Sequence, residues 1–195
     1  METNALSEKE SLELITRMIQ NTRTNMEHGG GKLFLLWGYD GLIISLLVYF
    51  LLKQTGNPEV QFLFWLIPLI GYTLMFLFLR KKAKPITTYV DKSIGHIWLT
   101  LGVGFMLTPL MLIWVDIPVI FFVSLLMGIG VGISGFMIGI QSIRNLGFLG
   151  MLFSCLLLFV KGPEIIPAFC ITILTCMILP GYILNRKSAK IKENV

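Results

Sequence analysis

Charged residues are scarce in this chain. Asp, Glu, Lys and Arg together make up 14% of its 195 residues, whereas hydrophobic residues make up 55% and the mean hydropathy is +0.79. An ordinary soluble domain carries roughly 25% charged residues. The scarcity of charge excludes such a domain and indicates a polytopic membrane protein.

Residue types that carry catalytic or metal chemistry are also few. The chain has two histidines and three cysteines, and it contains no HExxH, no phosphate-binding glycine loop, no GxSxG and no pair of intramembrane carboxylates. Cys155, Cys170 and Cys176 all fall within apolar stretches, where we expect them to be packing residues and not disulfides or metal ligands. We therefore expect no enzymatic activity, no metal and no other cofactor.

Long apolar runs are abundant. They predict an all-α membrane bundle of six transmembrane helices at 33–52, 60–79, 97–115, 117–140, 143–160 and 165–184. The segment 143–160 is the weakest, because its uncharged core from Asn145 to Val160 covers only about 24 Å and Arg144 must snorkel for it to span. A re-entrant segment is the alternative at this position.

The basic residues support six spans. If the N-terminus is cytoplasmic, Lys53 and Lys161 are the only two of the sixteen Lys and Arg residues that face the other side. The positive-inside bias therefore predicts that both termini are cytoplasmic, with the protein in a bacterial inner (cytoplasmic) membrane. Because the basic residues are scattered among short loops, we expect the lipid bilayer and not a nucleic acid as their partner.

The chain divides into three parts. Residues 1–32 are predicted to form a cytoplasmic amphipathic helix at about 8–28 followed by a glycine-rich turn at Gly29, Gly30 and Gly31. Residues 33–184 form a single bundle of three helical hairpins, and residues 185–195 form a basic cytoplasmic tail. The apolar arc of the first helix consists of Leu12, Ile15, Met18, Ile19, Thr22 and Met26.

The opposite face of the 8–28 helix mixes acidic and basic residues. Glu13 and Arg17 lie there together with Gln20, Thr24 and His28. A mixed face binds anionic lipid poorly, so docking onto protein is favoured over binding to a lipid surface. The protein is either a separate partner or the chain's own bundle.

Asp40 is the one acidic residue well inside a predicted span. It lies on the order of 10 Å from the start of the first span, beside Tyr39. A carboxylate at that depth must be protonated, accept hydrogen bonds or face the bundle interior. Asp40 and Tyr39 are therefore a candidate intramembrane polar site that binds a proton or a cation. The alternative is a structural carboxylate bonded to Lys32, to a tyrosine hydroxyl or across helices.

Small residues at helical spacing mark the fourth predicted span. Ser124, Gly128, Gly132, Gly135 and Gly139 share an arc of roughly 80°. Such a face allows close helix approach in lipid. With Gly130 and Ser134 on the other side, the helix can touch two neighbours, one of which can be a second copy in a homo-oligomer. We expect a larger side chain at Gly132 to be less tolerated than one at Gly130.

Aromatic and basic residues are expected to anchor the bundle at the membrane interface. They are Trp37, Trp98, Arg80, Lys81, Lys82 and Lys84. Taken together, the sequence favours a non-enzymatic scaffold or regulatory membrane protein that uses its 8–28 helix. The alternative is a small oligomeric transporter or proton-linked permease with Asp40 as the titratable site.

Overall fold

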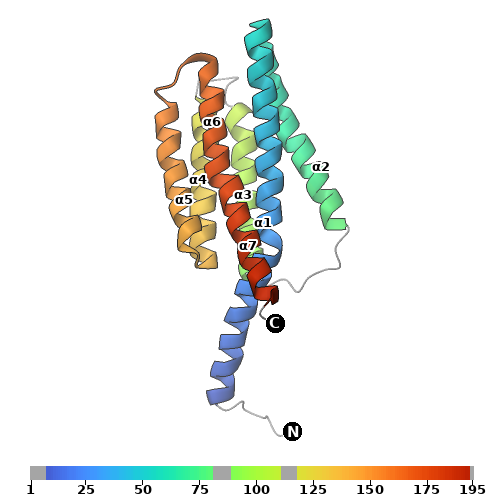
Figure 1. Cartoon of the computed structure of the whole chain (residues 1–195), viewed down its shortest axis with the longest axis vertical. Helices are drawn as coiled ribbons and strands as arrows, with labels where there is room; N and C mark the ends of the chain where they lie inside the picture. The colour runs from blue at the N-terminus through green and yellow to red at the C-terminus, as the bar shows by residue number, and fades with distance from the viewer. Residues whose placement is uncertain (1–7, 81–88, 111–117, 194–195) are drawn as a thin grey trace.

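The computed structural model describes residues 8–80, 89–110 and 118–193, and this part of the chain is helical without any strand. The elements pack as an elongated bundle (Figure 1). The helices are α1 (Glu8–Thr55), η1 (Pro58–Trp65), α2 (Leu66–Arg80), α3 (Tyr89–Leu110), α4 (Val119–Ile138), α5 (Gln141–Leu157), η3 (Gly162–Glu164), α6 (Ile165–Ile173), η4 (Leu174–Ile178) and α7 (Leu179–Glu193).

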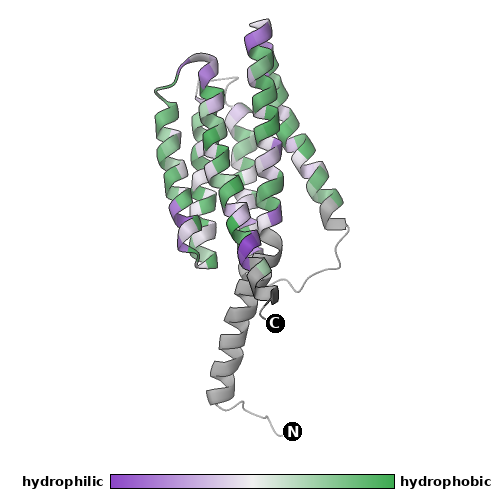
Figure 2. Cartoon of the chain, viewed as in Figure 1, coloured by the Kyte–Doolittle hydropathy of each residue, from purple (hydrophilic) through white to green (hydrophobic). Residues whose placement is uncertain are grey.

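Five stretches within the described residues are long and apolar enough to cross a membrane. They are Gly31–Thr55, Pro58–Leu77, Lys92–Leu110, Val119–Ile138 and Gly162–Lys187. Figure 2 shows hydrophobic residues along the length of the bundle and hydrophilic residues gathered near its two ends. These five correspond to five of the six predicted spans. The remaining prediction, 143–160, corresponds to α5, a helix of 17 residues that is too short to belong to the five.

The first helix does not turn at its glycines. α1 is one helix of 48 residues that runs through Gly29, Gly30 and Gly31, so the predicted glycine-rich turn is wrong. At Gly31 the reason is packing: a Cβ there would lie 2.8 Å from the carbonyl oxygen of Gly181 and 2.9 Å from the Cβ of Leu184, both on α7. Gly31 is therefore small because a neighbouring helix comes close. The part of α1 before Gly31 extends beyond the bundle, at the end where α7 also runs out (Figure 1).

The glycine face of α4 is filled by α5. A Cβ on Gly128 would lie 2.8 Å from the backbone nitrogen of Met151, and a Cβ on Gly147 would meet the backbone of Gly132. α5 thus supplies its own glycines to the contact, and the two helices touch backbone to backbone. Gly139 is different, because it is exposed and ends α4 in the left-handed conformation with φ 75°. It closes the turn into α5 and is not part of the packed face.

The structure does not support the expectation that a larger side chain is less tolerated at Gly132 than at Gly130. A Cβ on Gly132 would meet only the Cε of Met151 at 3.7 Å, an ordinary contact, whereas a Cβ on Gly130 would lie 2.5 Å from the Cδ1 of Leu101 on α3. The backbone of Gly132 lies close to Gly147. A side chain at position 132 would nevertheless point away from this contact, into space that is not crowded. Both faces of α4 therefore carry close contacts, one with α5 and one with α3.

The last span contains a π-helical turn. In η4 the N–H of Leu179 donates to the carbonyl of Leu174, five residues back. Pro180 follows directly and has no N–H to offer the carbonyl of Cys176, which explains why the helix widens here. Gly38 of α1 makes room for the turn, since a Cβ on it would lie 2.9 Å from the Cγ1 of Ile178. The helix continues as α7 to Glu193, so the 185–195 tail begins as an extension of the last span.

Gly135→Ala tests the contact between α4 and α5. The added Cβ would lie 2.7 Å from the Cα of Arg144 and 3.0 Å from the carbonyl carbon of Ile143. Backbone atoms cannot rotate away, so we expect the free energy of unfolding in detergent to fall by about 1–3 kcal/mol. Gly95→Ala is the matched control, because no atom of the described residues lies within 4 Å of its Cβ position. Equal stability of the two variants would contradict the contact.

Candidate functional site

Asp40 lies on a face of α1 that packs against the second helix of the chain. Trp37, Asp40 and Ile44 are spaced i, i+3 and i+7 and so share one side of the helix. The ring of Trp37 lies against Gly71 of α2, and its centroid is 5.2 Å from that of Tyr72 in an edge-on arrangement. Ile44, on the other side of Asp40, is in an apolar cluster with residues of η1 and α2. Asp40 is held between these two apolar contacts.

The carboxyl group of Asp40 is buried inside the bundle. The residue is 8% exposed, and its Oδ2 has no hydrogen-bond partner among the described residues. Burying a charged carboxylate in apolar surroundings costs several kcal/mol unless it is paired. The group is therefore suited to holding a proton or to meeting a cation. This placement is what a proton or cation site requires, so Asp40 stays a candidate. The structural alternative requires a bond to Lys32, to a tyrosine hydroxyl or across helices, and Oδ2 makes no such bond among the described residues.

Tyr39 points elsewhere. Its hydroxyl is 2.6 Å from the hydroxyl of Tyr182 on α7, and either oxygen can be the donor. Both rings are exposed on the outside of the bundle, with 40% and 46% of their surface accessible. Neighbouring positions on a helix diverge by 100°, so Asp40 and Tyr39 leave α1 in different directions. The structure does not bring the two candidate residues together.

Trp98 connects three helices. Its ring lies edge-on to Phe34 of α1 with centroids 5.4 Å apart, and its indole N–H donates to the hydroxyl of Ser134 on α4 at 3.1 Å. The hydroxyl of Ser134 in turn donates to the carbonyl of Gly130. Trp37 and Trp98, both predicted to be membrane-interface anchors, each pack against the ring of a residue on another helix, and their place at the interface stays a prediction. Arg80 is the last residue of α2, and Lys81, Lys82 and Lys84 lie outside the described residues.

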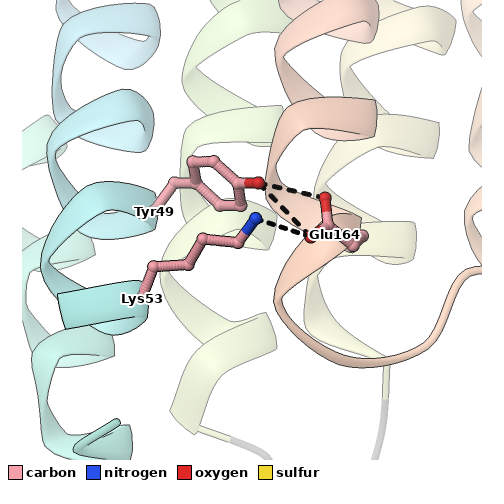
Figure 3. A network of polar contacts seen from close by, with 3 residues as sticks. All are labelled: Tyr49, Lys53 and Glu164. Atoms are coloured by element: carbon pink, nitrogen blue, oxygen red, sulfur yellow. Dashed lines mark hydrogen bonds and ion pairs between the residues drawn. The ribbon is translucent and has the colours of Figure 1, made fainter. Parts of the chain in front are cut away.

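A polar network that the sequence analysis missed joins α1 to η3, directly before α6, at the end of the bundle away from the N-terminal segment (Figure 3). The Nζ of Lys53 is 3.1 Å from an oxygen of Glu164, and the hydroxyl of Tyr49 donates to the same carboxylate at 3.1 and 3.3 Å. Both charged side chains are more than half exposed, so the pair adds little stability. The sequence did contain a signal for this pair. Lys53 and Glu164 have opposite charges and fall in two short turns that are predicted on the same side of the membrane.

An apolar hollow of about 320 Å³ adjoins this network. Leu52, Phe64, Ile120 and Ile166 are among the residues that line it. Among the described residues that line it, none has a titratable side chain.

The predicted docking residues of the 8–28 helix belong to α1, but their side chains lie outside the described residues. No group of three or more His, Cys, Asp and Glu side chains that could hold a metal occurs in the described parts of the chain. No protein-family model, curated protein or solved structure matches this chain. Asp40 and the course of α1 are therefore the features of the molecule that bear on its function.

Proposed function

We propose that the chain is a non-enzymatic scaffold or regulatory protein of a bacterial inner membrane, and that the segment of α1 from residue 8 to residue 30 is an arm that docks a cytoplasmic protein. The observation that carries the proposal is the unbroken course of α1 from Glu8 to Thr55. An interfacial helix lies in the plane of the membrane surface. An arm in line with a membrane-spanning helix points away from that surface.

The arm is long enough to be a binding element. The helical part before Gly31 covers about 35 Å. An amphipathic helix of this length typically binds by laying its apolar face into a groove of another protein, with anchors at i, i+3, i+4 and i+7. Leu12, Ile15 and Ile19 have this spacing. The mixed charges on the other face suit an aqueous surface better than anionic lipid.

The proposed orientation places both termini in the cytoplasm, with α5 as the sixth span. The sorting of Lys and Arg residues supports this orientation, and so does the emergence of the arm and of α7 at one end of the bundle. α5 packs along α4 through contacts at Gly128, Gly132 and Gly135, and its 17 residues cover about 26 Å. A helix paired with a spanning helix over this length needs only a few further residues to reach both interfaces.

Ile19→Glu tests the arm. A charge in the apolar stripe should prevent insertion into a partner's groove, so we expect specific partners to be lost from affinity purifications of the solubilised native membrane. Gln20→Glu is the matched control, since it adds the same side chain on the opposite face and should leave the partners bound. Removal of residues 1–28 should have the effect of Ile19→Glu. The proposal fails if the partner list is the same in all variants.

A second candidate function is a small oligomeric transporter or proton-linked permease with Asp40 as its titratable site. The specific observation in its favour is the buried Oδ2 of Asp40, which has no hydrogen-bond partner among the described residues. Intramembrane carboxylates of this kind mark proton and ion pathways.

Asp40→Asn distinguishes this second function. In liposomes the variant should lose proton-coupled flux, while its thermal midpoint in detergent stays equal or rises because a buried ionisable group has been removed. Glu164→Gln is the control, since it makes the same carboxylate-to-amide change at an exposed position and should transport normally. Equal flux through wild type and Asp40→Asn would exclude the Asp40 mechanism.

A further inference from the structure

Three helices meet at one level in the centre of the bundle. A Cβ on Gly150 of α5 would touch the sulfur of Cys176 in η4 and would lie 3.5 Å from the Cα of Gly128 in α4. This is a contact between α4, α5 and η4 in which two of the three residues have no side chain. It fixes which positions of the three helices are level with one another.

One turn away from this contact, each of the three helices carries a hydroxyl. α4 and α6 each run antiparallel to α5. A step of four residues toward the N-terminus from Gly128 or from Cys176 therefore leads the same way along the bundle as a step of four residues toward the C-terminus from Gly150. These steps arrive at Ser124, Thr172 and Ser154, all with 0% exposure. Residues four apart lie on roughly the same helix face, so this spacing places the three hydroxyls about one turn from the junction, on the sides of the three helices that form it.

The hydroxyls at this level are bonded differently from others in the bundle. The hydroxyls of Thr73, Thr100, Thr108, Ser134 and Thr175 each donate to the carbonyl four residues back on their own helix. The Oγ of Ser124 and the Oγ1 of Thr172 have no partner among the described residues. The Oγ of Ser154 donates to the carbonyl of Met151 at 2.6 Å and keeps its lone pairs to accept.

A fourth buried hydroxyl lies on α1, about two turns from the junction and one turn beyond the level of Thr172. A Cβ on Gly41 of α1 would be 3.4 Å from the Cδ1 of Ile173, and Ser45 is one turn further along the same face. Ser45 also has 0% exposure, and its Oγ has no hydrogen-bond partner in the described parts of the chain. Unsatisfied hydroxyls on α1, α4 and α6 therefore occur at neighbouring levels of one bundle.

We propose that Ser124, Ser154 and Thr172 form a buried site for one water molecule. Buried polar groups are hydrogen-bonded as a rule, and a buried water needs two to four polar partners. Water can accept from the hydroxyls of Ser124 and Thr172 and donate to the oxygen of Ser154, which satisfies all three. The three hydroxyls carry no charge, so a neutral ligand that both donates and accepts fits the site better than a cation.

A double-mutant cycle tests the water site. Ser124→Ala and Thr172→Val remove a hydroxyl with little change of shape. Each should lower the thermal midpoint of the full chain in detergent by roughly 2–4 °C. The double variant should be no less stable than the worse single variant, because the two hydroxyls share one water. Thr172→Ser keeps the hydroxyl and should keep the coupling to Ser124→Ala.

Thr108→Val is the control, since Thr108 is buried but bonds to its own helix. Its effect should add to that of Thr172→Val. Additive effects of Ser124→Ala and Thr172→Val would overturn the proposal of a shared water and show that the two hydroxyls are bonded independently, each to its own helix. A rise in the thermal midpoint of either variant would also overturn it and show that the hydroxyl is unsatisfied. The salt dependence of the thermal midpoint distinguishes water from a cation. If the midpoint is higher in NaCl than in choline chloride, and Thr172→Val removes the difference, the site binds a cation and the proposal of a water is overturned.

Discussion

The close approach of helix backbones at small residues is the contact on which the rest of this structure depends. Lipid tails are as apolar as leucine, so the helices gain little from hiding apolar side chains from them, and packing must hold the bundle together. Gly147 against Gly132 does this between α5 and α4, and Gly31 against Gly181 does it between α1 and α7. A side chain at any of these contacts would hold two helices apart.

The same contacts determine how α1 is held. Its glycines at 31, 38 and 41 face α7, η4 and α6 in turn, while Trp37 packs on α2 and Phe34 meets Trp98 of α3. A helix that is held on several sides over its membrane part has a fixed direction. An unbroken extension of that helix has the same axis. The packing of the bundle, and not the side chains of the arm, therefore sets the direction of the arm.

Local patterns in the sequence predicted much of the fold. The spacing of Gly128 and Gly135 is a property of one helix, so the sequence alone was enough to predict their packed face. Long apolar runs predicted the five stretches that are long and apolar enough to cross a membrane. Pairings between distant helices could not be read in this way. Gly147 as the counterpart of Gly132, Tyr182 as the partner of Tyr39 and Glu164 as the partner of Lys53 all depend on tertiary arrangement. The run Gly29 to Gly31 misled because consecutive glycines favour turns in water, whereas here the helix continues and Gly31 lies against α7.

The continuity of α1 is the central claim, and a distance across its glycines tests it most directly. Nitroxide labels can be introduced as non-natural amino acids at Thr16 and Leu46, so that the three native cysteines stay in place. Electron paramagnetic resonance then measures the distance between them in liposomes. One unbroken helix predicts a single narrow distribution centred near about 45 Å. A broad distribution at clearly shorter distances would show a hinge at residues 29–31 and would contradict a rigid arm.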